Sequence, residues 1–316
     1  MRFETVTGLA AVEDVRLVDA HGHVWIRPPQ GVSDDAKLEL CDYEPIEAEL
    51  ADFRRGGATT IVDCQPGGCG RDARMLVRLA RATGLHITAT TGFHRQRYYP
   101  EADWLWSATE EKATAYFVEE LTCGMRETDG EVPATTIKIG YEGFLEGQSV
   151  ILMLAAAEAA RHTGAAILCH TERGKNVEAL PSFFGDRGVV ADRLYICHVD
   201  KRPDVGLHRE LAEAGALLGY DTFVRPLYDP EQGAWPLLKK MVADGLAEHI
   251  AVGLDLAEGA MWRHYGGQPG MLALPEQVVP RLREEGISES VIAQLTGQNI
   301  AEYLVRQTSE GKELSE

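Results

Sequence analysis

Residues 16–26 read RLVDAHGHVWI, an apolar run that carries two histidines two positions apart, His21 and His23. Side chains at positions i and i+2 of a strand point to the same side, so both imidazoles are expected on one face. Seven further short apolar runs follow, and segments with the apolar spacing of helices separate them. The eight predicted strands span residues 16–26, 59–65, 86–94, 135–140, 165–171, 193–199, 216–223 and 249–256.

The alternation of strands and helices indicates a parallel sheet. Helical spacing is clearest over residues 73–82, 150–163, 207–214 and 235–246, and the first three are each followed by a glycine stop before the next strand. Eight such repeats with right-handed crossovers most simply close into a (β/α)8 TIM barrel. An open doubly wound sheet is the alternative, but no Gly-x-Gly-x-x-Gly follows the first strand. We therefore predict an α/β fold with one barrel domain over residues 1–305. Residues 1–15 are expected to form a lid over the barrel bottom, and residues 306–316 a charged, disordered tail.

Composition narrows the possible partners. The chain has 316 residues and a formal net charge of −18, which argues against nucleic acid or an anionic membrane as a partner. It contains no run of about twenty apolar residues, and its first residues lack the pattern of a secretion signal. The six cysteines form no C-x-x-C motif, so free thiols in a reducing compartment are expected. These features predict a cytoplasmic protein.

Chemically active residues recur at the ends of the predicted strands, where the active site of a barrel forms. His170 ends the fifth strand, His198 the sixth and Asp255 the eighth, and Lys138 lies within the fourth. A single histidine at such a position is more often structural, and a single aspartate often caps the next helix. A buried unpaired lysine is costly, however, and needs a partner or chemical conversion. Together with the histidine pair of the first strand, these residues suit divalent metal ions.

Four further residues lie next to the candidate ligands or near the end of the seventh strand. Strand alternation sends Cys169 and Cys197, each one residue before a candidate ligand, toward the helix layer, so both are expected in the core. Asp200 is expected on the same face as His198, either orienting a ligand or relaying protons, or else as a solvated loop residue. Asp221, near the end of the seventh strand, either has a role in the site or caps the following helix.

This pattern of histidines, lysine and aspartate on strands one, four, five, six and eight resembles the amidohydrolase superfamily. Within it, the chain resembles the phosphotriesterase-related branch, which includes lactonases. Weaker support comes from TIVD at 60–63, GRD at 70–72, IKIG at 137–140 and LTGQN at 295–299. The resemblance covers about residues 5–305. Some family members use a strand-seven histidine in a proton relay; residues 219–223 read GYDTF here, so that relay is not carried over.

The resemblance implies a centre of two divalent ions, and it assigns the ligands as His21, His23 and Asp255 for the buried ion and His170 and His198 for the exposed ion. Lys138, carbamylated by carbon dioxide, would bridge both ions beside a hydroxide that acts as the nucleophile. Zinc is expected, with manganese, cobalt or iron as alternatives. Asp255 is the expected catalytic residue, which takes the proton of the bridging water and passes it to the leaving group. A homodimer is also implied.

Basic residues in the loops expected at the catalytic face favour a polar substrate. They are Arg95, Arg97, Arg173, Lys175, Lys201, Arg225 and Arg263. Any one of them is more simply a solvated loop charge, and Glu258 adds negative charge nearby, but the group favours a phosphate or carboxylate on the substrate. We predict hydrolysis of a lactone or carboxylic ester, such as a phosphorylated sugar lactone. The predicted substrate contacts are Arg225, Arg263, His264 and Tyr141.

Three other functions stay open at this point. The first is phosphotriester hydrolysis, more plausible as a side activity. The second is a Schiff-base lyase with Lys138 as the amine nucleophile, which predicts imine trapping by borohydride and no metal requirement. The third is a barrel that binds metal without turnover, because a metal site alone does not prove catalysis.

Overall fold

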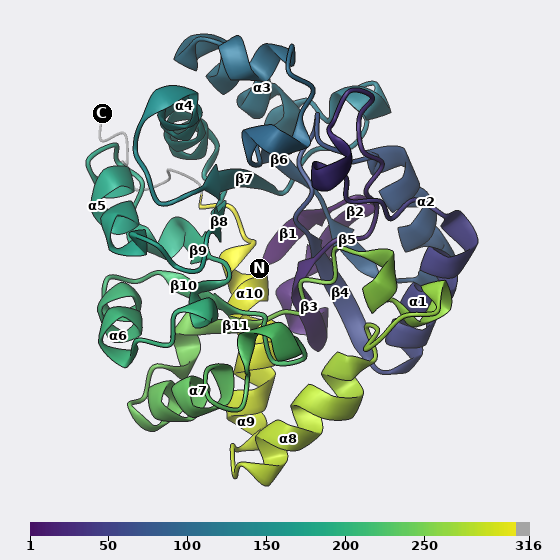
Figure 1. Ribbon diagram of the computed structural model, residues 1–316, viewed down its shortest axis with the longest axis vertical. Helices are drawn as coiled ribbons and strands as arrows, with labels where there is room; N and C mark the ends of the chain where they lie inside the picture. The colour runs from purple at the N-terminus through teal and green to yellow at the C-terminus, as the bar shows by residue number, and fades with distance from the viewer. Residues whose placement is uncertain (308–316) are drawn as a thin grey trace, which may run out of the picture.

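In the computed structural model, which describes residues 1–307, parallel strands stand around a barrel with helices outside them (Figure 1). In chain order the strands are β3 (Leu17–Gly22), β4 (Ala58–Asp63), β5 and β6 (His86–Thr88 and Thr90–Gly92), β7 (Thr136–Tyr141), β8 (Ile167–Thr171), β9 (Leu194–Ile196), β10 (Leu217–Tyr220) and β11 (Ile250–Val252). The third barrel strand is interrupted at Ala89, which divides it into β5 and β6. The backbone N–H of Asp255 donates to the carbonyl of His21, which joins the last strand to the first. The predicted (β/α)8 barrel is confirmed.

The outer layer consists of helices that bury one face against the strands. They are α1 (Tyr43–Arg55), α2 (Ala73–Thr83), α3 (Glu110–Thr122), α4 (Gly147–Thr163), α5 (Leu180–Gly185), α6 (Val205–Glu213), α7 (Ala234–Ala243), α8 (Val279–Glu284) and α9 (Glu289–Ala293). The last helix, α10 (Asn299–Tyr303), instead packs against the inner cluster of the barrel. Helices α2 and α4 end at Gly84 and Gly164, whose φ angles of 72° and 68° are left-handed. Glycine adopts this conformation without strain, which explains the predicted helix stops. No helix within residues 1–307 is long and apolar enough to cross a bilayer.

Both ends of residues 1–307 lie at the amino ends of the barrel strands. A hairpin of β1 (Arg2–Thr5) and β2 (Gly8–Ala11) brings Phe3 into one apolar cluster with Val18 and Leu217. At the other end of the chain, the guanidinium of Arg306 donates to the carbonyls of Leu121 and Ala134. The rest of the predicted tail, residues 308–316, lies outside the described residues.

The apolar core has an inner cluster within the barrel and an outer cluster between strands and helices. Cys169 belongs to the outer cluster, as predicted, but Cys197 belongs to the inner one, so the prediction for Cys197 was wrong. The physical reason is the backbone of the next residue, because His198 has a left-handed φ of 61°. The inward alternation of β9 continues to Cys197, and this turn then brings His198 to the barrel mouth, where extended backbone would have directed it outward.

Candidate metal centre

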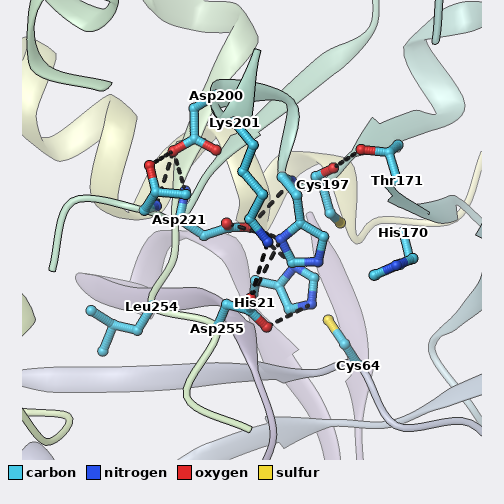
Figure 2. Close-up of polar contacts among 12 residues, drawn as sticks. His21, Cys64, His170, Thr171, Cys197, Asp200, Lys201, Asp221, Leu254 and Asp255 are labelled. Carbon is cyan, nitrogen blue, oxygen red and sulfur yellow. Dashed lines mark hydrogen bonds and ion pairs between the residues drawn. The ribbon is translucent and has the colours of Figure 1, made fainter. Parts of the chain in front are cut away.

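Four imidazoles gather at the carboxyl ends of the strands. The ring centroid of His21 lies 5.4 Å from that of His23 and 4.4 Å from that of His198, and His198 lies 4.9 Å from His170. His21 and His23 both face inward because β3 has a register shift against β4 between Asp19 and Gly22. Figure 2 shows His170 on the far side of the cluster from Asp221 and outside the network of ion pairs. The four predicted histidines therefore meet in one place.

Asp255 presents its two carboxylate oxygens to different neighbours. Oδ1 lies 3.6 Å from Nε2 of His23 and 4.0 Å from Nε2 of His21, whereas Oδ2 lies 3.6 Å from Nδ1 of His198. A left-handed φ of 53° after Leu254 turns the side chain into the mouth. Burial raises the pKa of Asp255, but His198, His23 and His21 hold it well below its ordinary value. The Asp255 carboxylate is thus anionic, and His21, His23 and Asp255 form a compact set that could hold one ion.

Lys138 lies fully buried on β7 at the floor of this cluster. Its Nζ is 3.5 Å from Nε2 of His21. The neighbouring residue across the ladder is Gly92, where any Cβ would collide with the Lys138 backbone, so glycine lets β6 approach closely. Burial lowers the pKa of Lys138, but Cys64, Cys197 and the site carboxylates raise it overall. The Lys138 ammonium therefore lies beside His21 in the candidate site.

The charge states of the histidines suit metal ligation. Burial, with Lys138 nearby, lowers the pKa of His21 to about 4, and burial also lowers the pKa of His170 and, to well below its ordinary value, that of His198. Neutral imidazoles are the form that binds divalent ions. Nδ1 of His21 is buried and makes no hydrogen bond, although Oδ2 of Asp221 is 3.4 Å away. An unsatisfied buried nitrogen among neutral imidazoles and a carboxylate fits a metal centre.

Asp221 is the main site residue to which the sequence analysis gave no definite role. It is fully buried, and its oxygens lie 2.8 and 2.9 Å from Nδ1 of His198. His21, His198 and Asp221 form a second set able to hold an ion. Asp200 does not contact His198; its Oδ2 accepts from the backbone N–H groups of Asp221 and Thr222 and from the Thr222 hydroxyl, which fixes the end of β10. Burial and Asp221 raise the pKa of Asp200 to about 8.

Other contacts to the histidines were also missed. Nδ1 of His23 lies 3.2 Å from Oε1 of Gln65, and Nε2 of His170 lies 2.9 Å from Oε1 of Glu172. His94 packs on His170 with ring centroids 4.6 Å apart. Gln65 and His94 each end a predicted strand, so the criterion that selected His170 and His198 would also have selected them. Glu172 lies two residues after His170 and could have been found by the same i, i+2 reasoning.

The four predicted substrate contacts lie in different surroundings. Arg225 lies at the centre, donating to the backbone carbonyl and Oδ2 of Asp255 at 2.6 and 3.1 Å. Nζ of Lys201 lies 3.6 Å from the same Oδ2 (Figure 2). Arg263 and His264 are not brought to the centre: Arg263 pairs with Glu276, and His264 pairs with Asp52 of α1. The Tyr141 hydroxyl donates to the carbonyl of Asn176.

The comparisons with known proteins agree with this geometry. A model of the phosphotriesterase family matches residues 1–304. The phospho-furanose lactonase of Mycoplasmopsis synoviae (strain 53) is 27% identical over 307 residues, covering 91% of this chain and 87% of that protein. Two solved structures superpose with a TM-score of 0.90: the lactonase Lmo2620 from Listeria monocytogenes, at 25% identity over 98% of this chain and 100% of that one, and an amidohydrolase from Mycoplasma synoviae, at 26% identity over 97% and 92%. Because the family model covers the strands of the barrel and its metal centre together, the chain belongs to the phosphotriesterase family and is a metal-dependent hydrolase.

Proposed function

We propose that the chain hydrolyses a lactone or carboxylic ester that carries an anionic group, at a centre of two divalent ions. The observation that carries this proposal is the burial of Lys138 beside His21, at the place where four histidines and Asp255 gather. Carbamylation would convert the buried ammonium into an anionic oxygen ligand between His21, His23 and Asp255 on one side and His170 and His198 on the other. The names of the lactonase relatives support the choice of bond.

Different residues of the chain would serve the different steps of the hydrolysis. Two ions at such a centre lower the pKa of a shared water and polarise the scissile carbonyl. With Oδ1 directed to His21 and His23, Oδ2 of Asp255 is placed to accept the proton of the attacking water. The water oxygen bonds to the carbonyl carbon, the acyl–oxygen bond breaks, and the departing alkoxide takes the proton from Asp255. The products are a hydroxy acid from a lactone, or an acid and an alcohol from an ester.

The anionic group of the substrate is assigned to Lys201 and Arg225. Both cations pair with Oδ2 of Asp255, and both lie over the ring of Tyr228. If Asp255 binds a metal ion, its carboxylate attracts Lys201 and Arg225 less strongly. The two cations can then bind an anion at the edge of the mouth. A neutral phosphotriester would not use these cations, which places phosphotriester hydrolysis second.

The number of divalent ions bound per chain tests the proposed two-ion centre. The protein is purified without chelator, with metal and bicarbonate present, and the divalent ions per chain are measured for the wild type, for Lys138→Ala and for Lys175→Ala. Lys175 is the matched control because it lies on the catalytic face with its ammonium on the ring of Phe144, away from the centre. We expect close to two ions in the wild type and the control and a marked loss in Lys138→Ala. A wild type that takes up no metal contradicts the proposal, and trapping of Lys138 by borohydride with a carbonyl substrate would support the lyase.

Substrate charge tests the anion site. Hydrolysis is compared for a lactone with and without a phosphate substituent and for a neutral phosphotriester, in the wild type, Lys201→Met, Arg225→Met and the Lys175→Ala control. A hydrogen bond to a charged group contributes about 1.5–3 kcal/mol, so each methionine variant should lose about tenfold or more in kcat/KM on the phosphorylated lactone relative to the unphosphorylated one. If the ratio of kcat/KM on the two lactones is the same in the variants and the wild type, the phosphate binds elsewhere. Zinc as the metal and a homodimer remain predictions for elemental analysis and sedimentation.

A further inference from the structure

His94 is a buried histidine at the mouth that the proposed chemistry does not use. It follows β6, the third barrel strand, and is 6% exposed. Its ring packs against His170, with centroids 4.6 Å apart, and against Tyr98, with centroids 4.7 Å apart. It therefore lies beside the candidate ligand that Figure 2 shows on the far side of the cluster from Asp221.

The hydrogen bond at Nδ1 determines which nitrogen carries the proton. The backbone N–H of Arg95 donates to Nδ1 of His94 at 2.7 Å. A ring nitrogen accepts only when it has no proton of its own, so the imidazole is neutral and its proton is on Nε2. Flipping the ring would put a carbon in front of the Arg95 N–H, which opposes that alternative. With Nδ1 occupied and Nε2 protonated, His94 is a hydrogen-bond donor and not a metal ligand.

The donor is free and its position is fixed. Among residues 1–307, Nε2 of His94 has no hydrogen-bond partner, and it is not one of the fully buried polar atoms that lack one, so it retains contact with solvent. The backbone N–H of His94 donates to the Tyr99 hydroxyl at 3.0 Å, and the N–H of Phe93 donates to the Lys138 carbonyl at 2.9 Å. The backbone beside His94 is thus attached to the strand that carries Lys138. A donor held in this way loses little freedom when it binds.

The order of the strands places His94 across the mouth from the anion site. Lys201 and Arg225 follow β9 and β10, whereas His94 follows β6, with β7 and β8 between them in the sheet order. A small substrate anchored by its anionic group at Lys201 and Arg225 therefore extends toward His94 over the centre. We propose that His94 donates its Nε2–H to a hydroxyl oxygen on this far part of the substrate and so selects hydroxylated lactones or esters. This inference rests on the proposed hydrolysis and names a specificity-determining residue for it.

Two amide variants separate the roles of the two ring nitrogens. Glutamine at position 94 puts an amide NH2 near the place of Nε2 and keeps the donor. Asparagine puts its amide near the place of Nδ1, where it can accept from the Arg95 N–H but cannot reach the substrate. The measurements are metal content and kcat/KM for D-ribono-1,4-lactone 5-phosphate, whose ring carries hydroxyls, and for its 2,3-dideoxy analogue, which keeps the phosphate and has no ring hydroxyl.

The expected result is a loss of about tenfold in kcat/KM on the ribonolactone phosphate for His94→Asn, since the substrate hydroxyl oxygen then has no donor in the site, with recovery in His94→Gln. The dideoxy analogue should respond little to either variant, and both variants should keep wild-type metal content. Equal losses in the two variants, equal losses on the two lactones, or loss of metal would each overturn the proposal.

A second measurement does not depend on turnover. Long-range ¹H–¹⁵N NMR spectra of the metal-loaded protein, with the His94 signals assigned by their absence in His94→Gln, report the tautomer directly. A proton on Nε2 is expected, and a proton on Nδ1 or on both nitrogens would overturn the inference. A wild type that hydrolyses no lactone would contradict the proposed function, and the tautomer would still decide whether His94 is the donor described.

Discussion

Replacing Asp221 with asparagine should weaken metal binding without unfolding the protein. The carboxylate is fully buried, and its two oxygens contact Nδ1 of His198 while Oδ2 also approaches His21. It increases the basicity of the imidazole that it contacts, and removing such a partner typically costs 10- to 100-fold in metal affinity. Asparagine has nearly the same shape and can still accept from Nδ1–H of His198, so the change removes charge more than volume.

The magnitude follows from these contacts. A hydrogen bond to a charged group contributes about 1.5–3 kcal/mol and a neutral one about 1 kcal/mol, so the exchange should lose about 0.5–2 kcal/mol at His198. Each 1.4 kcal/mol is about tenfold in affinity, and the weaker contact to His21 adds to it. The neutral side chain also removes the repulsion that contributes to the raised pKa of Asp200, about 8, so the metal-free variant should unfold no more easily than the wild type.

The assay is competition for metal between the apoprotein and a fluorescent chelator. The matched control is Glu172→Gln, which also changes a carboxylate beside a candidate ligand, but on a side chain that is 38% exposed and therefore screened by water. We expect about 10- to 100-fold weaker binding for Asp221→Asn and about threefold or less for the control. Equal effects of the two variants would refute the reasoning, because burial would then not distinguish them. Loss of one whole ion would show that Asp221 is itself a ligand.

Two further predictions concern buried charges. Arg71 pairs with Glu120 at 2.7 Å with both side chains fully buried, so Arg71→Met should lower the free energy of unfolding by roughly 3–5 kcal/mol in urea denaturation, and adding Glu120→Gln should recover part of it; no recovery would mean that the lost contacts were not electrostatic. Reconstitution of metal-free protein should be slow near pH 7 and faster at higher pH and with bicarbonate. The pKa of Lys138 is raised above its ordinary value, and only the unprotonated amine reacts with carbon dioxide. A rate of metal uptake that does not change with pH or with bicarbonate would exclude carbamylation.

The barrel and the convergence of the candidate ligands could be predicted from the sequence because both depend on local features. Strand and helix alternation is visible in apolar spacing, and parallel strands bring their carboxyl ends to one rim whatever the loops do. His21, His23, Lys138, His170 and Asp255 therefore converge as expected. Helices α2, α4, α6 and α7 also begin and end near the predicted residues, and left-handed glycines end α2 and α4 locally, whereas α1 and α3 were given no predicted range.

Long-range contacts and single backbone torsions were decided only by the tertiary structure. Cys197 faces inward with Tyr195 by ordinary alternation, and the left-handed backbone of His198 then brings that histidine to the mouth, so the two neighbours do not take opposite faces as the prediction assumed. Arg225 reaches Asp255, whereas Arg263 is held by Glu276 and His264 by Asp52, although all three looked alike as polar residues in loops of the catalytic face. The composition of a loop and the spacing of its residues do not determine the path that its backbone takes. The path itself depends on partners distant in the chain, such as the 212 positions that separate Asp52 from His264.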